Sequence, residues 1–417
     1  MTEEAFVEAV RRAGGRVFLV GGWVRDRFRG VPAHDKDYVV CGLNEEAFCA
    51  SFPDAFRAGK SFPVYRLPID GKTAEVAFAR RERKTGKGYR GFDVIFDPSV
   101  TIEEDLYRRD TTMNSIAMEL PKGNLLDPYG GREDIRKGII RAVSSHFTED
   151  PVRALRAARQ SAEFGFTVEP GTLRYMKACE KELLAEPSER LVGELERALR
   201  SPQPSRFFRT LLAAGLLKSI FPEIAALIGK TQPAAFHPEG DSFEHIMLVV
   251  DTVAQETDDV VARFAGLAHD LGKGTTPADM LPHHYGHEIR GLDVFDAWDA
   301  RMHFPRRWSE AARFVIREHM RAPRMKKKGK MARLLLDIDK SSLTLDEFNA
   351  VIRADSHGLP LYLAGGAFFL SVMKTVSGRD APEGLQGREI GEWIFARQCE
   401  VFRKAYADVL RALNTSS

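Results

Sequence analysis

Residues 19–40 read LVGGWVRDRFRGVPAHDKDYVV, and this stretch carries the pattern on which the expected fold rests. The apolar run at 17–20 predicts a β-strand that ends at a Gly-Gly pair. A helix is predicted over 23–29, where Gly and Pro then end it, and 38–40 predicts a second strand. A strand, a glycine turn, a helix and a strand in this order predict an α+β head.

The glycine turn suits the binding of a phosphate chain. Gly22 lets backbone N–H groups approach phosphate oxygens, and the helix N-terminus adds a partial positive charge. Arg25, one turn into the helix, can add a charge-assisted contact. Asp35 and Asp37 follow at the start of the second strand, where side chains at i and i+2 share a face. Such a carboxylate pair suits Mg²⁺ and phosphoryl transfer, and a solvated acidic turn is the alternative.

The rest of the chain changes from mixed to helical character. Residues 73–79 alternate and predict a third strand, on which Glu75 is either a third carboxylate of the site or an ordinary exposed residue. Strand signals nearly vanish after residue 145, and amphipathic helices are predicted over 191–199 and 207–217. A loop is expected at 233–240 and a Gly/Pro-rich interruption at 378–387. The predicted fold class is α+β, with a mixed-sheet head followed by an all-α body.

Composition excludes several classes of protein. The 417 residues are 44% hydrophobic and 10% aromatic, which is enough for several buried cores. With 61 Lys+Arg against 59 Asp+Glu, the net charge of +2 argues against a protein that merely coats nucleic acid, but allows a local basic groove. The 4 cysteines show no CxxC spacing, which fits a reducing compartment. No signal peptide or membrane span is evident, so we expect a cytoplasmic protein.

The segment that begins near residue 149 could select a nucleotide base. Asp150 and Arg153 are expected near the start of a helix that Pro151 opens, side by side at i and i+3, with Arg156 further round and Arg159 on the far side. A carboxylate that accepts from an exocyclic amino group and a guanidinium that donates to a ring nitrogen would accept C and A and reject U and G. An acidic cap with an ordinary ion pair is the alternative.

Eight of the 11 histidines lie between residues 237 and 319. His245 is expected to begin an apolar helix, His269 and Asp270 to end another, and Asp355 to complete a set of four ligands. Imidazole and carboxylate ligands suit Mn, Fe, Ni or Zn and allow Mg. The alternative is that each histidine is an ordinary core or surface residue.

The motifs together resemble the class II nucleotidyltransferases, which include bacterial CCA-adding enzymes and poly(A) polymerases. The matching segments are 19–40, FARRERKTGKGYRGF at 78–92, DLYRRDTTMNSIA at 105–117, LLDPYGGREDI at 125–135 and FTEDPVRALRAARQSAEFGF at 147–166. The resemblance implies that Asp35 and Asp37 hold Mg²⁺ and that Arg109 binds the triphosphate or sugar. It also implies that 80–92, with Gly86 and Gly88, is a flexible loop that governs the change from adding C to adding A.

The histidine-rich part resembles the HD phosphohydrolases. Their pattern His…His-Asp…Asp is matched by His245, His269, Asp270 and Asp355. The segment PHHYGHE at 282–288, with its three histidines His283, His284 and His287, resembles the CCA-adding enzymes that carry an HD domain. The resemblance implies phosphatase and 2′,3′-cyclic phosphodiesterase activity that depends on Ni, Mn, Fe, a similar ion or Mg²⁺.

The expected division of the chain follows from these resemblances. It comprises a nucleotidyltransferase head at 1–140, a helical neck for base recognition and RNA binding at 141–225, an HD domain at 226–360 and a helical tail at 361–417. The expected reaction adds C, C and A to the 3′ end of tRNA from CTP and ATP and releases pyrophosphate. Gly22, Arg25 and Arg109 would hold the nucleotide, Asp150 and Arg153 would choose the base, and Arg156 and Arg159 would support that pocket.

Several alternatives stay open at this point. The head motifs do not separate a CCA-adding enzyme from a poly(A) polymerase or from a relative that adds only CC or only A. An HD phosphohydrolase with an RNA-binding head and an RNA chaperone are rivals of other classes. The basic run at 324–330 either contacts tRNA phosphates or is a solvated loop. We expect a monomer or homodimer with no membrane partner.

Overall fold

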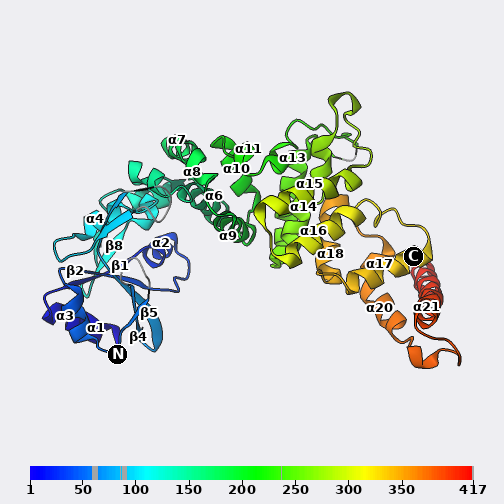
Figure 1. Cartoon of the computed structure of the whole chain (residues 1–417), viewed down its shortest axis with the longest axis horizontal. Helices are drawn as coiled ribbons and strands as arrows, with labels where there is room; N and C mark the ends of the chain where they lie inside the picture. The colour runs from blue at the N-terminus through cyan, green and yellow to red at the C-terminus, as the bar shows by residue number, and fades with distance from the viewer. Residues whose placement is uncertain (59–63, 85, 87–91, 236, 416–417) are drawn as a thin grey trace. The chain divides into compact units, whose positions relative to one another are not determined.

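The computed structural model describes residues 1–58, 64–84, 86, 92–235 and 237–415 (Figure 1). These residues form two compact units. The first unit comprises Met1–Glu194 and Arg206–Ile220, and the second comprises Leu195–Ser205 and Phe221–Ser417. Each unit has its own core and carries its own candidate site, so the two are described separately.

A seven-stranded mixed sheet with the order β3-β4-β5-β2-β1-β8-β9 forms the centre of the first unit. Its strands are β1 (Arg16–Val20), β2 (Asp37–Cys41), β3 (Phe56–Ala58), β4 (Val64–Ile69), β5 (Lys72–Phe78), β8 (Ala117–Leu120) and β9 (Asn124–Leu126). β2 pairs in parallel with β5, and its pairing with β1 is antiparallel. The central strands are buried on both faces, which explains why their sequences are continuous apolar runs rather than alternating ones.

Both faces of this sheet are covered. On one face, Phe18 and Val39 pack into a cluster with Leu106 of α4 (Ile102–Tyr107). On the other face, the ring of Tyr38 contacts Phe6 of α1 (Glu3–Arg12), with 5.5 Å between ring centroids. The packing fixes β1 and β2 side by side, so that the turn after β1 and the first residue of β2 meet at one edge of the sheet.

The remaining elements up to residue 220 are mostly helical. The helices are α2 (Gly22–Arg29), α3 (Glu45–Ser51), α5 (Gly131–Lys137), α6 (Arg153–Phe164), α7 (Pro170–Ala178), α8 (Glu180–Leu183), α9 (Ser188–Leu199), α10 (Ser205–Ala213) and α11 (Leu217–Ile220). Two small ribbons pair β6 (Arg81–Lys84) with β7 (Phe92–Ile95) and β10 (Ile139–Ile140) with β11 (Thr167–Val168).

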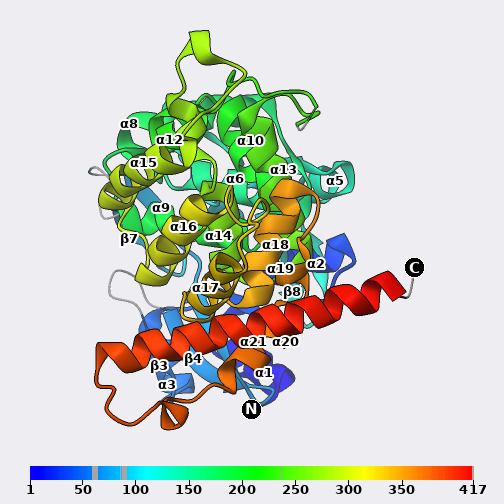
Figure 2. The same cartoon turned by 90° about the vertical axis from the view of Figure 1, so that its right-hand side faces the viewer.

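The second unit is all helical in the residues that the structure describes. Its helices are α12 (Pro222–Ala225), α13 (Ser242–Glu256), α14 (Val260–Ala268), α15 (His287–Met302), α16 (Arg306–Glu318), α17 (Lys328–Asp339), α18 (Leu345–Ser356), α19 (Leu361–Ala364), α20 (Gly366–Lys374) and α21 (Arg388–Thr415). Every residue of α14 is buried, and Phe264 from this helix packs on Trp308 with 4.7 Å between ring centroids. The long α21 packs against α17 and α20 (Figure 2).

The α+β fold class expected from the sequence is confirmed, and two expected helices are corrected. The helix expected over 207–217 ends at Ala213, because Gly215 adopts a φ of +69° and α11 starts separately. The helix expected to open near Asp150 begins at Arg153 instead. Asp150 is extended, with φ −107° and ψ 106°, because the following proline disfavours helical backbone at this position. No helix in the described part of the chain is long and apolar enough to cross a bilayer.

Candidate active sites

A pocket of about 400 Å³ lies in the first unit where β1 ends and α2 begins. Its wall includes three carboxylates, those of Asp37, Asp110 and Asp150. Six arginines also line it: Arg25, Arg80, Arg108, Arg109, Arg153 and Arg156. A concentration of guanidinium groups of this kind suits a polyanion such as a nucleoside triphosphate.

The glycine turn forms one side of this pocket. Gly21 precedes α2 with a φ of +68°, a conformation that favours glycine. A side-chain carbon at this position would lie 3.5 Å from both Arg109 Nη1 and Asp37 Oδ2, so the backbone passes close to both charged groups. Gly22 begins the helix and also lines the pocket. The N-terminal backbone N–H groups of α2 can therefore meet an anion bound here.

The structure places Asp37 in the pocket wall as the first residue of β2. Its ladder partner on β5 is Glu75, which pairs with Arg66 at 2.7 Å. The pKa of Asp37 is raised, first by loss of hydration and then by the charges of Glu75 and Asp35, while Arg109 opposes the shift. Asp35 lies in the segment before β2 and outside the pocket lining. The like-charged neighbours of Asp37 favour a bound cation, and carboxylate oxygens are ligands that a hard divalent cation such as Mg²⁺ accepts.

A buried carboxylate that sequence reasoning missed holds the Arg108–Arg109 pair in place. Asp105 is 0% exposed, and its two oxygens lie 2.7 Å from Arg108 Nη2 and 2.9 Å from Arg109 Nη2. Burial acts to raise the pKa of Asp105, but the two guanidinium groups lower it to about 2. The sequence contained a signal for this arrangement. Asp105 precedes Arg108 by three residues and Arg109 by four, and residues with these spacings lie on the same side of a helix.

A hydrogen-bond chain joins three elements around the pocket. Arg25 Nη1 donates to Asn114 Oδ1 at 2.9 Å, and Asn114 Nδ2 donates to Asp110 Oδ1 at 3.1 Å. Arg156 Nη2 lies 2.9 Å from Asp110 Oδ2. Burial acts to raise the pKa of Asp110, but Arg156 and Asn114 hold it below its usual range. The charged Asp110 thereby ties Arg25 of α2 to Arg156 of α6.

Asp150 and Arg153 share the pocket, but the geometry differs from the expected helical pair. Asp150 precedes α6, and its carboxylate pairs with Arg190 at 3.1 Å rather than with Arg153 among the described residues. Arg153, only 9% exposed, donates from Nη1 to the carbonyl of His146 at 2.8 Å. Arg159 lies outside the pocket lining and pairs with Glu194 at 2.8 Å. Arg190 is thus a further residue that sequence reasoning missed.

The expected flexible loop at 80–92 is described only in part. Residue 85 and residues 87–91, which include Gly88, lie outside the described residues. Gly86 forms a bend. Arg80 lines the pocket and pairs with Glu82 at 2.7 Å.

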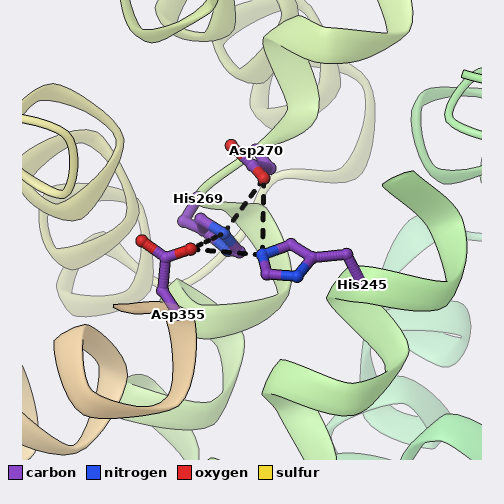
Figure 3. Close-up of side chains that lie close together, drawn as sticks. All are labelled: His245, His269, Asp270 and Asp355. Carbon is purple, nitrogen blue, oxygen red and sulfur yellow. Dashed lines mark hydrogen bonds and ion pairs between the residues drawn. The ribbon is translucent and has the colours of Figure 1, made fainter. Parts of the chain in front are cut away.

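The second unit brings the four predicted ligands together (Figure 3). His245 comes from α13, His269 and Asp270 directly follow α14, and Asp355 comes from α18. His245 Nε2 and Asp355 Oδ1 lie 3.2 Å apart, as do His269 Nε2 and Asp270 Oδ2. One ligand atom from each of the four lies within 4.8 Å of the others.

The chemistry of these four side chains fits a divalent cation. His245 Nδ1 hydrogen-bonds Glu239 at 2.6 Å and His269 Nδ1 hydrogen-bonds the Gly266 carbonyl at 2.7 Å, which directs both Nε2 lone pairs into the cluster. His269 Nε2 and both oxygens of Asp270 are buried without a hydrogen bond of good geometry among the described residues. Burial acts to lower the pKa of His269, but the neighbouring carboxylates raise it to about 10, so the cluster attracts positive charge. Glu239 was not foreseen from the sequence.

Comparison with known proteins places the chain in a family. The chain matches three family models, described as "Poly A polymerase head domain" over residues 17–141, "Probable RNA and SrmB- binding site of polymerase A" over 165–228 and "HD domain" over 224–345. A relative from Methylobacillus flagellatus, named multifunctional CCA protein, is 39% identical over 413 residues, which cover 94% of this chain and 98% of the relative. The chain belongs to the multifunctional CCA protein family.

A further member agrees with this assignment, and solved structures share the fold. The multifunctional CCA protein of Nitrosococcus oceani is 44% identical over 82% of this chain and 84% of its own. The structure of the Bacillus stearothermophilus CCA-adding enzyme in complex with CTP has a TM-score of 0.67 and 24% identity, over 99% of this chain and 97% of that one. The Thermotoga maritima CCA-adding enzyme complexed with tRNA has a TM-score of 0.59 and 21% identity, with coverages of 97% and 94%. The resemblance to CCA-adding enzymes with an HD domain is therefore confirmed.

Proposed function

We propose that this multifunctional CCA protein adds C, C and A to the 3′ end of tRNA from CTP and ATP without a nucleic-acid template. The observation that carries the proposal is the first pocket, where the glycine turn, the carboxylate of Asp37 and six arginines, among them Arg153, lie together with Asp150. The 3′-hydroxyl oxygen of tRNA forms a bond to the α-phosphorus, and the bond to the departing pyrophosphate breaks. The reaction needs polyanion binding and a base reader in one place, and this pocket supplies both.

The chain's own residues bind and orient the triphosphate. The α2 N-terminus at Gly22 and the guanidinium groups of Arg25 and Arg109 hold the phosphates. Asp105 prevents Arg109 from swinging away, because their ion pair is anchored on a fully buried carboxylate. Asp35 and Asp37 would hold Mg²⁺, which when bound neutralises charge on the phosphates and promotes attack by the hydroxyl.

Base choice is assigned to Asp150 and Arg153. Arg190 holds the Asp150 carboxylate and the His146 carbonyl holds the Arg153 guanidinium, so each side chain is fixed before a nucleotide enters. The carboxylate accepts from the amino group of C or A, and the guanidinium donates to the adjacent ring nitrogen. Arg156 supports this wall through Asp110, and Arg159 supports α6 from outside the pocket.

The second unit is assigned metal-dependent phosphatase and 2′,3′-cyclic phosphodiesterase activity. His245, His269, Asp270 and Asp355 would hold the divalent ion, with Ni, Mn, Fe or Mg²⁺ as candidates. The four parts expected from the sequence, 1–140, 141–225, 226–360 and 361–417, remain the proposed functional division. The four cysteines show no CxxC spacing, which is consistent with the reducing compartment of the cytoplasm.

The proposal is tested by extension of a tRNA transcript that lacks its CCA end. With Mg²⁺, CTP and ATP, we expect three added residues and then a stop, because the pocket admits C and A alone. UTP and GTP should give no extension. Product lengths are resolved on a sequencing gel. A long A-tail would identify a poly(A) polymerase, a stop after CC or addition of A alone would identify a specialised relative, and no extension would favour the HD unit as the active part.

Removal of one base-reading group should relax nucleotide selection. In Asp150→Asn the carboxamide can also donate a hydrogen bond, so discrimination against UTP should fall by about 1–3 kcal/mol, which is roughly 5- to 150-fold in relative kcat/KM. The measurement is single-turnover incorporation of each nucleotide onto the same transcript. Glu163→Gln is the matched control, because Glu163 lies on α6 but outside the pocket lining. Unchanged selectivity in Asp150→Asn would remove Asp150 from base recognition.

A further inference from the structure

Phe164, the last residue of α6, contacts two arginines of α2. The guanidinium carbon of Arg25 lies 4.5 Å from the centroid of the Phe164 ring, and that of Arg29 lies 4.1 Å from the same centroid. Both distances are within the range of cation–π contacts, in which the negative face of an aromatic ring attracts a cation. A side-chain carbon on Gly22 would lie 3.6 Å from Arg25 Nη2, so the guanidinium that Phe164 contacts also borders the glycine turn.

The guanidinium of Arg25 is held by three different parts of the chain. Its Nε and Nη2 donate to the two oxygens of Asp26 at 2.9 and 3.0 Å, and its Nη1 donates to Asn114 Oδ1 at 2.9 Å. Asp26 belongs to α2, like Arg25 itself, and Asn114 lies just before β8. The donors of a guanidinium lie in one plane, so these bonds restrain movement within that plane more than movement out of it. The Phe164 ring adds a contact from α6.

The charges at this place favour an aromatic ring. Asp26 Oδ1 accepts from Arg25 Nε at 2.9 Å and from Arg29 Nη1 at 3.0 Å. One carboxylate therefore faces two guanidinium groups, which repel each other at this separation. The face of the Phe164 ring carries a partial negative charge that offsets part of this repulsion. A ring does so without placing a further carboxylate beside a pocket that suits polyanions.

The end of α6 that carries Phe164 is anchored from outside the pocket. Gly165 ends the helix with a φ of +71°. Arg206 of α10 donates to the carbonyl of Ser161 at 3.1 Å and to that of Phe166 at 3.0 Å. These bonds satisfy carbonyl groups at the C-terminus of the helix, where intrahelical partners run out. The position of Phe164 is therefore set by the backbone of α6.

α6 links this contact to base selection. Arg153 is its first residue and Phe164 its last, about 16 Å further along the helix axis. Arg153 and Arg25 line the same pocket, whereas Phe164 does not. We propose that Phe164 is a positioning residue that places Arg25 for the phosphates of the nucleotide. One helix then carries a base-reading side chain at one end and the support of a phosphate-binding side chain at the other. This inference rests on the proposed function of the pocket.

The test compares a ligand that has phosphates with one that lacks them. Equilibrium dialysis of the full chain with Mg²⁺ gives the Kd of radiolabelled CTP, and competition by unlabelled cytidine gives the Kd of the nucleoside. In Phe164→Leu the Kd of CTP should rise by about 3- to 30-fold, the range of a cation–π contact, while that of cytidine stays unchanged. Phe164→Tyr keeps the aromatic face and should restore the parent Kd of CTP. In an Arg25→Ala background, Phe164→Leu should have no further effect.

The controls separate positioning from packing. Phe166→Leu removes a neighbouring ring, whose centroid lies 5.9 Å from that of Phe164, and should keep the parent Kd of CTP. Phe164→Met is the second variant should thermal unfolding show that Phe164→Leu does not fold. An unchanged Kd of CTP, or an equal loss of affinity for CTP and cytidine, would overturn the role of Phe164 and leave the proposed function standing. Failure of the parent chain to bind CTP would overturn both.

Discussion

The Asp37→Asn variant should lose tRNA extension by at least about 10³-fold in kcat/KM, which corresponds to roughly 4 kcal/mol of transition-state stabilisation. Asp37 is the pocket-wall carboxylate that lies 3.5 Å from where a side-chain carbon of Gly21 would lie, and an amide in its place cannot balance a divalent cation. The measurement is single-turnover addition of the first C to a transcript that lacks CCA.

The same substitution should leave the fold intact or stabilise it. The pKa of Asp37 is raised in the folded chain, so folding disfavours the ionised carboxylate and the contribution of this group to stability is lost as pH rises through that pKa. At pH 7 the neutral amide avoids this penalty, and the midpoint of thermal unfolding should be unchanged or higher. Asp54→Asn, at an exposed position of the first unit, is the matched control and should keep full activity. Extension at the parent rate by Asp37→Asn would disprove the metal assignment in the head.

Asp270→Asn should abolish hydrolysis of a 2′,3′-cyclic phosphate, with a loss of about 10²-fold or more, while CCA addition continues. Asp270 is 1% exposed, faces His269, His287 and His319, and belongs to the four-residue candidate site, so its substitution removes a ligand from that site. The measurement follows release of the phosphomonoester from a cyclic dinucleotide substrate in the presence of Ni²⁺ or Mn²⁺, with CCA addition by the same preparation assayed in parallel.

Asp270→Asn should also lower the stability of the protein, so a second variant is needed to separate this effect from the loss of hydrolysis. Asp270→Asn leaves Lys273 buried without its carboxylate partner, which lowers the free energy of unfolding by about 3–5 kcal/mol. Asp355→Asn keeps the Lys273 pair and removes one of the four candidate ligands, so it should lose hydrolysis at a smaller cost in stability. Asp279→Asn, at an exposed position, should change neither property. Full hydrolysis in Asp355→Asn would exclude the four-residue site, and loss of CCA addition in Asp270→Asn would show that the two activities depend on each other.

Local sequence was sufficient for the elements that carry each site. The strand, glycine turn and helix around Gly21 were predictable because each depends on the backbone preferences of a few adjacent residues. The two corrected helices also have local causes. Gly215 stops α10, and the first error came from giving apolar spacing more weight than this glycine. The second error came from placing Pro151 within the first turn of the helix, whereas it keeps Asp150 extended and outside α6.

The ion pairs that organise the pocket were not predictable. Asp150 pairs with Arg190, 40 residues away, and Asp110 with Arg156, 46 residues away. The i, i+3 spacing on a helix predicted that Asp150 lies beside Arg153. In the folded chain, however, a carboxylate pairs with the cationic side chain that the packing of neighbouring elements brings closest to it. The chain has 61 Lys and Arg residues, and spacing alone does not distinguish among partners on different elements.

The sequence by itself determined the fold class, the order of the motifs and the identity of the four candidate HD ligands, because these depend on backbone preference and on motifs that are read along the chain. Only the tertiary structure decided that His319 and His287 meet at Oδ1 of Asp270. His319 lies at the end of α16 and His287 at the start of α15, and nothing in their spacing predicts a shared partner. The physical reason is that packing of α15 and α16 sets which side-chain atoms converge, and a metal site depends on distances between those atoms.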